Sequence, residues 1–247
     1  MKKYVLMLVS AIAALFYSTP AAAYDCEVDG IYYYRTSATE LEVACKVFSD
    51  NNRTAYSGAV TIPATVTYNG KTFNVTSIGE YAFRDCNSLT SVTIPSSIRE
   101  IKSFAFYNCS SINAINIPAT VAAIGAGCFE GCASIVSMTI PTGITEIEDE
   151  LFFGCTALKT VVLPASITAI GENAFARCTS LLSVYLLATT APTCANNAFD
   201  KVDRTWCTLY VPKGSKSYQN ESVMRDFFIE EFEGKIEQAN LTPQISK

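Results

Sequence analysis

The 247-residue sequence predicts a repeat solenoid, because one motif recurs five times at a constant period of 23 residues between Ile78 and Leu186. The repeated positions are cysteine (Cys86, Cys109, Cys132, Cys155, Cys178), phenylalanine (Phe83, Phe106, Phe129, Phe152, Phe175) and isoleucine (Ile78, Ile101, Ile124, Ile147, Ile170). A period in the twenties is typical of solenoids with one supersecondary unit per repeat. A single unit cannot bury these side chains alone, so the stacked units are expected to share a continuous core.

Each unit is expected to contain one short strand and one compact turn. In the first complete unit Val92 and Ile94 alternate with polar residues, which predicts a short, half-buried strand. Pro95 ends this strand, since proline lacks the backbone donor that a ladder requires. The turn before the strand carries Phe83 and Cys86.

The complete motif, Ile-Gly-x-x-Ala-Phe-x-x-Cys followed by Leu-x-x-Val-x-Ile-Pro, resembles the BspA-like (treponemal) class of bacterial surface leucine-rich repeat. The match covers residues 75 to about 187 well, and weaker versions extend it to about 58 and about 230. Leu151 and Cys128 depart from the alanine column, and Leu187 departs from the proline column. The resemblance implies a right-handed superhelix with short parallel strands on one face and short helical or irregular turns on the other.

Residues 1–23 are predicted to be a signal peptide. Lys2 and Lys3 precede an apolar run from Tyr4 to Phe16, and three alanines at 21–23 provide a small-residue cleavage site. The apolar run is too short to span a bilayer, which argues against the alternative of a membrane anchor. No later stretch predicts a membrane span, so the chain is expected to be exported and either secreted or held at the cell surface of a bacterium.

The remaining chain divides into four predicted parts. Residues 24–57 form an N-terminal β cap with strands near 31–34 and 41–47, because an uncapped solenoid would expose an unpaired edge. Residues 58–187 hold the repeats, 188–233 a degenerate last repeat and C-terminal cap, and 234–247 a polar tail. Pro63 and Pro95 lie 32 residues apart, nine more than the period, and the excess predicts a hairpin turned by Asn69-Gly70.

Composition excludes several classes of function. The chain has no histidine, which removes Ser-His-Asp and Cys-His catalysis and histidine-ligated zinc. It also has no glycine-rich phosphate loop, so no catalytic residue, metal or cofactor is expected. The net charge is −5, or 16 − 23 = −7 without the two signal lysines, which argues against nucleic acid. The run Glu146, Glu148, Asp149, Glu150 matches no calcium loop and is expected to be a solvated face.

The ten cysteines fall into two groups. Those of the repeat column are expected to be buried free thiols, because side chains stacked in one direction suit a disulfide poorly. Cys128 and Cys132 lack further ligands for a metal and are interpreted in the same way. In an exported protein, Cys26 with Cys45 and Cys194 with Cys207 are predicted to form local disulfides, the second worth roughly 3 kcal/mol.

The outward residues of the repeat strands form the candidate binding surface. The mid-strand column is Thr61, Thr93, Asn116, Thr139, Val162, Tyr185 and Tyr210, and a second column is Ala59, Ser91, Ala114, Ser137, Thr160, Ser183 and Thr208. Seven rungs at ~4.8 Å would make a strip of roughly 34 Å, of the extended kind on which solenoids bind. Alternatively, Thr and Ser serve strand propensity and solubility, and Tyr185 packs against Tyr210.

These observations predict a non-catalytic, monomeric protein-binding module that works without a cofactor and binds by surface complementarity. The family resemblance implies adhesion to host extracellular or neighbouring-cell proteins. The alternatives are a carbohydrate- or envelope-binding module, in which Tyr185 and Tyr210 stack on sugar rings, and a structural spacer. Ice binding through threonines is disfavoured, since Asn116 and Val162 interrupt their column.

Overall fold

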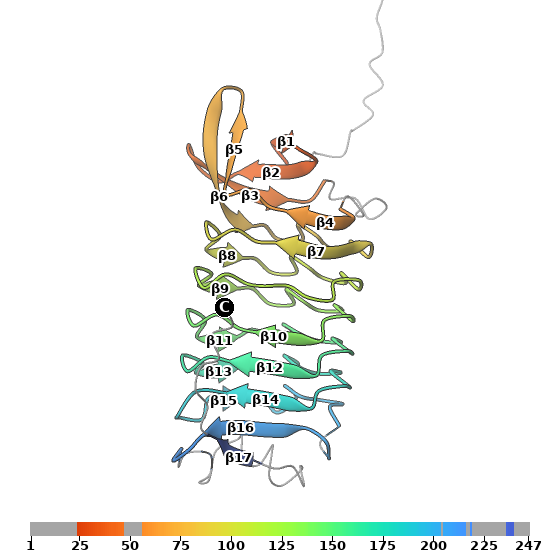
Figure 1. Ribbon diagram of the computed structural model, residues 1–247, viewed down its shortest axis with the longest axis vertical. Helices are drawn as coiled ribbons and strands as arrows, with labels where there is room; N and C mark the ends of the chain where they lie inside the picture. The colour runs from red at the N-terminus through yellow and green to blue at the C-terminus, as the bar shows by residue number, and fades with distance from the viewer. Residues whose placement is uncertain (1–23, 47–55, 204, 216–217, 219–235, 240–247) are drawn as a thin grey trace, which may run out of the picture.

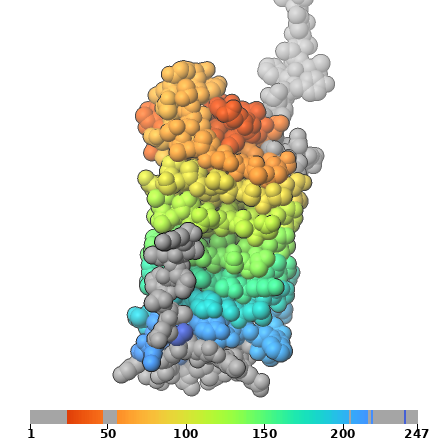
Figure 2. Space-filling view, in the orientation of Figure 1, coloured from red at the N-terminus to blue at the C-terminus, as the bar shows by residue number. Residues whose placement is uncertain are grey.

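A computed structural model describes residues 24–46, 56–203, 205–215, 218 and 236–239 of the chain. Successive coils stack along the long axis of the molecule, with the N-terminal strands at one end and the last strand at the other (Figure 1). The chain therefore appears in the space-filling view as successive bands of colour, in which each coil contacts its neighbours in the sequence (Figure 2). The predicted signal peptide, residues 1–23, lies outside the described residues.

Parallel strands form two ladders that run along the stack. The first ladder contains β4 (Gly58–Thr61), β7 (Leu89–Thr93), β10 (Ser137–Thr139), β12 (Thr160–Leu163), β14 (Ser183–Leu186), β16 (Thr208–Pro212) and β17 (Ile236–Ala239). The second contains β6 (Lys71–Ile78), β8 (Glu100–Ile101), β9 (Ala123–Ile124), β11 (Glu146–Ile147), β13 (Ala169–Ile170) and β15 (Thr193–Cys194), and it is divided into two sheets between β9 and β11. The sequence predicted the first ladder. The strands of the second are mostly two residues long, which is too short for an alternating pattern to reveal them.

The register of the first ladder confirms the repeat. Ser137 pairs with Thr160 and Thr160 with Ser183, so each of these two steps of the ladder equals one period of 23 residues. Inward residues such as Val161 and Leu163 are buried, whereas the outward Thr160 and Val162 are half-buried. The ladder is divided at residues 112–117, which form no strand.

In each coil, the segment that carries phenylalanine and cysteine lies between the strand of the second ladder and the strand of the first. This segment is a turn without helix, and the described residues contain no α-helix. Two residues per turn have positive φ, for example Phe104 (φ 56°) and Asn108 (φ 56°), and a left-handed residue cannot continue a right-handed helix. Backbone hydrogen bonds join neighbouring turns, as from Phe106 N–H to the Cys128 carbonyl at 2.9 Å. Of the two predicted possibilities for these turns, the structure therefore contains the irregular one.

Stacked phenylalanine rings form the centre of the core. Ring centroids in the column Phe83, Phe106, Phe129, Phe152, Phe175 and Phe199 are 5.0, 5.5, 5.6, 5.4 and 4.9 Å apart, and neighbouring rings lie within 16° of parallel. All six side chains are fully buried. At the N-terminal end Tyr56 contacts Phe83, with the ring centroids 4.6 Å apart, and its hydroxyl donates to the Ala44 carbonyl at 2.8 Å. This contact links the cap to the core of the repeats.

The cysteine column has a hydrogen-bonding role besides filling space. Four of its five thiols donate to the phenylalanine carbonyl 26 residues earlier, at 2.9 Å from Cys109 to Phe83 and at 3.1 Å in the next three pairs. Cys109, Cys132, Cys155 and Cys178 are buried free thiols, which confirms the prediction. Burial raises the pKa of Cys132 and of Cys178 to about 12.

The N-terminal cap consists of β1 (Cys26–Val28), β2 (Ile31–Arg35) and β3 (Glu40–Ala44), and β3 pairs in parallel with β6. The cap thus continues the second ladder and covers its first edge. The predicted hairpin is confirmed as β5 (Thr65–Tyr68) with β6, and both turn residues, Asn69 and Gly70, have positive φ. An ion pair of 2.6 Å between Glu42 Oε2 and Lys102 Nζ joins the cap to the first repeats.

This ion pair predicts a loss of stability at high pH. The hydrogen bond to Glu42 raises the pKa of Lys102 above its ordinary value of 10.5, against the opposing effect of partial burial. The folded state therefore binds the lysine proton more tightly than the unfolded state, and the contribution is complete below about pH 10 and lost as pH rises through the folded-state pKa. In urea unfolding, Lys102→Met should cost about 1 kcal/mol at pH 8, and this cost should shrink as pH rises above 10.5 through the folded-state pKa. An equal cost at pH 8 and above the folded-state pKa would show that the ammonium charge is not responsible, and Lys71→Met on the hairpin is the control for loss of a lysine.

The C-terminal end contains a further strand within 234–247, the segment predicted to be a polar tail. Residues 236–239 form β17, which pairs in parallel with β16 and places Ile236 opposite Leu209. Main-chain hydrogen bonding accounts for this strand, because any segment of suitable backbone conformation can satisfy the open edge of β16 whatever its side chains. Nothing in the described part of the chain forms a helix with the length and apolar character that crossing a membrane requires.

Candidate interaction surface

We call the outward side of the first ladder the strand face. Strand pairing brings Thr139, Val162, Tyr185 and Tyr210 into one column and places Thr61 beside Thr93. Asn116 is exposed but belongs to the segment 112–117, so it lies between the two parts of the ladder. The structure therefore assembles the predicted column, with an interruption at Asn116. None of these side chains is charged, so contacts on the column would depend on shape and hydrogen bonding.

Tyr185 and Tyr210 pack on each other, as the alternative interpretation predicted. Their ring centroids are 4.6 Å apart and the rings are within 10° of parallel. Both side chains are half-buried. Because each ring covers one face of the other, the space between them cannot receive a sugar ring. The geometry therefore disfavours the particular carbohydrate site in which both tyrosines stack on a ligand between them.

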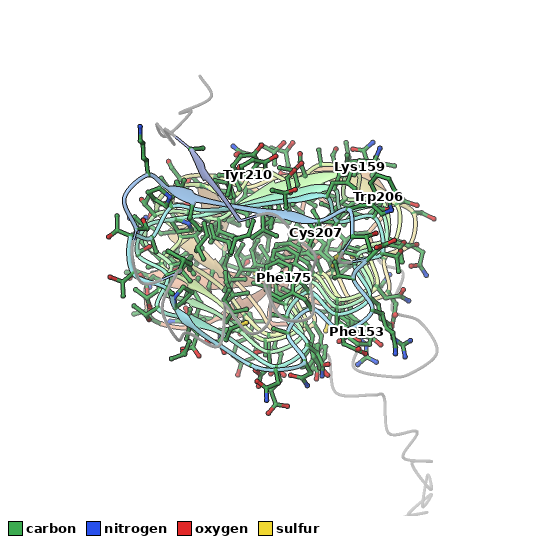
Figure 3. All side chains as sticks on the ribbon, turned by 90° about the horizontal axis from the view of Figure 1, so that it is seen from below. Phe153, Lys159, Phe175, Trp206, Cys207 and Tyr210 are labelled. Carbon is green, nitrogen blue, oxygen red and sulfur yellow. The ribbon has the colours of Figure 1, made fainter. Side chains whose placement is uncertain are left out.

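A further set of four residues lies at the edge of the strand face, where the strands of the first ladder begin. We call its four residues, Val136, Lys159, Leu182 and Trp206, the edge stripe. Backbone hydrogen bonds connect its first three residues from coil to coil, from Lys159 N–H to the Val136 carbonyl at 2.8 Å and from Leu182 N–H to the Lys159 carbonyl at 2.9 Å. Trp206 lies on the next coil, one residue before the position that pairs in register with Leu182. Val136 and Leu182 are 45% exposed and Trp206 is 72% exposed. Lys159 and Trp206 lie at the same end of the first ladder (Figure 3).

Sequence reasoning did not identify the edge stripe. The available signal was the 23-residue step from Val136 to Lys159 to Leu182, together with the one tryptophan of the chain. Apolar residues at a repeat position are usually buried, so the step alone indicated core. Exposure depends on the point where the turn ends and the strand begins, which only the folded chain specifies.

Hydrogen bonds to Asp203 fix the backbone around Trp206. The Asp203 carboxylate accepts from Thr205 N–H at 3.0 Å and from the Thr205 hydroxyl at 2.7 Å. The Asp203 carbonyl accepts from the backbone N–H groups of Trp206 at 3.4 Å and Cys207 at 3.3 Å. Ser183 pairs with Thr208, a step of 25 residues, so the coil carrying Trp206 is two residues longer than the period.

The four cap cysteines were predicted to form two disulfides. Cys26, Cys194 and Cys207 are free thiols in the structure. β2 lies between β1, which carries Cys26, and β3, which Cys45 follows, and two strand spacings of about 10 Å exceed the range of a disulfide. Cys194 ends β15 in the second ladder, whereas Cys207 precedes β16 in the first. The arrangement does not favour either bridge, and both pairings stay predictions.

A thiol count decides between these alternatives. The unfolded, unreduced protein should present six thiols to Ellman's reagent if both bridges form and ten if neither does, out of ten cysteines. In the folded protein the repeat-column thiols should stay unreactive at pH 8, because burial both blocks access and raises their pKa. Rapid labelling of the folded protein at Cys132 or Cys155, located by mass spectrometry, would contradict the buried column.

The acidic run lies beside the second ladder. Glu146 and Asp149 are exposed, and Glu148 is half-buried with its pKa raised by burial and by the nearby charges of Glu146 and Asp149. Among the described residues, no group of three or more His, Cys, Asp or Glu side chains is arranged to hold a metal ion.

Coils of similar length, parallel ladders and a shared apolar core define the class of leucine-rich-repeat solenoids. The family model described as the BspA type leucine rich repeat region matches residues 60–205 in six copies, and the chain belongs to this family. No curated protein matches the sequence.

Two solved structures show the same fold, and a third is similar at a lower TM-score. A leucine-rich repeat protein of T. pallidum is 18% identical, with 87% of this chain and 100% of that chain covered and a TM-score of 0.55. A leucine-rich repeat protein from Eubacterium ventriosum is 23% identical, with 64% and 40% covered and a TM-score of 0.50. One from Bacteroides ovatus is 22% identical, with 78% and 75% covered and a TM-score of 0.43. At these identities the likeness concerns the fold alone.

Proposed function

We propose that this BspA-type protein is exported and acts, secreted or at the cell surface, as a monomeric, non-catalytic protein-binding module in adhesion to host or neighbouring-cell proteins. The observation that carries the proposal is the strand face, where uncharged side chains stand in register across neighbouring coils. The backbone beneath them is held by ladder hydrogen bonds, so the surface is ordered before a partner arrives. Solenoids use such extended surfaces for recognition.

Protein is a better partner than carbohydrate for this surface. Sugar-binding sites commonly use aromatic rings with an open face, and the stacking of Tyr185 on Tyr210 covers one face of each ring. The column otherwise offers hydroxyl and small apolar groups, as at Thr93 and Thr139, which suit complementary packing over a wide area. Adhesion and export are supported by the family and by the basic and apolar pattern of residues 1–23.

The experiment uses the chain from Tyr24 onward, immobilised and exposed in parallel to host extracellular proteins and to a glycan array. Protein binding is expected, and Thr93→Arg with Thr139→Arg should abolish it, because two long cations would prevent close approach to the strand face. Thr145→Arg, an exposed position beside the second ladder, is the matched control and should bind normally. Binding to glycans alone, or equal loss in the control, would contradict the proposal. Antibody labelling of intact cells and of the culture medium locates the protein.

A further inference from the structure

We infer that the edge stripe, Val136, Lys159, Leu182 and Trp206, docks an amphipathic helix of the protein partner, with an acidic residue of that helix facing Lys159. The inference rests on the proposed function, since it assumes a protein partner, and it specifies where and how that partner is held.

The first argument is the distribution of exposed apolar side chains. Five large hydrophobic residues are exposed in the described part of the chain: Tyr34, Tyr68, Val136, Leu182 and Trp206. Tyr34 and Tyr68 lie in the cap and its hairpin. Val136 and Leu182 share one column on either side of Lys159, and Trp206 lies on the coil after Leu182, one residue out of that register. Single exposed hydrophobic residues are ordinary, but a contiguous apolar group marks an interaction site.

The second argument is the way in which Trp206 is presented. Its side chain is 72% exposed, although the hydrogen bonds to Asp203 hold the adjacent backbone in a defined turn. The neighbouring Cys207, which aligns with Leu182 through strand pairing, is buried instead. The two extra residues of this coil thus allow an outward tryptophan beside an inward cysteine. An exposed tryptophan on an ordered backbone loses little backbone entropy on binding, and tryptophan is a frequent hot-spot residue.

The third argument is spacing. Rungs of the ladder are ~4.8 Å apart, so three steps from Val136 to Trp206 span roughly 14 Å. A helix rises 1.5 Å per residue, so side chains at i, i+3, i+7 and i+10 on one face span about 15 Å. In an extended chain, four side chains on one face span about 20 Å, which does not match. A helix lying along the stack can therefore place one side chain on each residue of the edge stripe.

The fourth argument is charge. Lys159 is exposed between Val136 and Leu182, and it forms no ion pair within the described residues. In a chain of net charge −5, a cation at the middle of an apolar column favours a partner with a carboxylate at the matching position. A helix that carries one carboxylate among apolar side chains is the occupant to which this charge points.

The test uses the sole tryptophan of the chain as its reporter. Peptides are selected on the immobilised protein from two displayed libraries, one on a helical template and one on an extended template, and are then titrated against the free chain. We expect helical peptides with apolar residues at i, i+7 and i+10 and an acid at i+3, whose binding shifts Trp206 emission to shorter wavelength and reduces its quenching by acrylamide.

Variants define the contact. Leu182→Ala and Trp206→Ala should each weaken binding by about 30-fold, the loss typical of a hot-spot residue, in calorimetric titration. Lys159→Glu should also weaken it, and a Glu→Lys exchange in the peptide should restore that binding. Tyr34→Ala, an equally exposed aromatic on the cap, is the control and should bind normally. Thermal unfolding of each variant confirms that the fold is kept.

Three outcomes would overturn the inference: selection of extended peptides only, binders that leave Trp206 emission unchanged, or a blue shift that grows with protein concentration and shows self-association. If Thr93→Arg with Thr139→Arg abolishes capture of host proteins while Leu182→Ala and Lys159→Glu do not, the inference fails and the proposed function stands. If host proteins do not bind at all, the proposed function fails whatever the peptides do.

Discussion

Phe152→Ala is expected to lower the free energy of unfolding by about 3–5 kcal/mol, the range for a buried aromatic residue truncated in a packed core. The Phe152 ring is fully buried and stacks on two neighbours, with centroids 5.6 Å from Phe129 and 5.4 Å from Phe175. Each coil of a solenoid contacts only the next, so removing one ring weakens two interfaces and leaves no distant contact to compensate.

Phe153→Ala is the matched control for this prediction. Phe153 belongs to the same turn but is half-buried, and its main aromatic contact is the Arg177 guanidinium, 5.2 Å from the ring centroid. Figure 3 shows Phe175 of the ring column inside the coil and Phe153 at its outer edge. Loss of a partly exposed ring and its cation–π contact should cost about 1 kcal/mol. Equal losses in urea unfolding would refute the stacked column as the centre of stability.

Gly125→Ala is expected to cost roughly 3 kcal/mol, near the upper end of the usual range for overpacking, because the added methyl group would collide with the preceding coil. A Cβ at Gly125 would lie 2.5 Å from Ser103 N and 2.8 Å from Ser103 Cα. The Gly125 N–H donates to the Ile101 carbonyl at 2.8 Å, so the two backbones cannot separate without losing a ladder hydrogen bond.

Two further variants separate this collision from backbone conformational preference. Gly154 has a positive φ of 71°, but a Cβ there would meet nothing within 4 Å, so Gly154→Ala should cost only about 1 kcal/mol. Adding Ser103→Gly to Gly125→Ala should not restore stability, since the clash includes backbone atoms that glycine retains. Recovery in the double variant, measured by urea unfolding, would show that the Ser103 side chain was the obstacle.

Much of the fold was predictable because the same residue types recur at a constant spacing. Residues such as Phe106 and Phe129 recur at one period, and identical neighbours stacked with translational symmetry must align. The hairpin at Asn69-Gly70 was predictable for a local reason, since few residue pairs favour its turn. Both inferences need only short-range information or periodicity.

Other features left no such pattern. The left-handed positions include residues as different as Tyr81, Phe104 and Glu150, so backbone geometry imposed by the stack selects the conformation there. The strand β17 has a polar sequence and is defined by its pairing with β16. The first ladder is divided at Asn116, although its sequence alternates as in the other repeats.

For the candidate surface, too, the sequence predicted some features and the tertiary structure decided others. Alternation placed Tyr185 and Tyr210 on one face of the strands, and the register confirmed it. Whether the two rings would stack or stand free depended on the separation and tilt of adjacent strands, which the sequence does not encode in any single position.

By itself, the amino-acid sequence determined that this chain stacks similar coils around columns of phenylalanine and cysteine, because apolar residues at a fixed period can be buried only by the neighbouring repeat. The tertiary structure alone decided which residues face water where each turn meets its strand. Leu181 is buried and the adjacent Leu182 is exposed, since the point at which the turn becomes a strand sets the direction of each side chain. That choice exposes the edge stripe and leaves the core continuous beneath it.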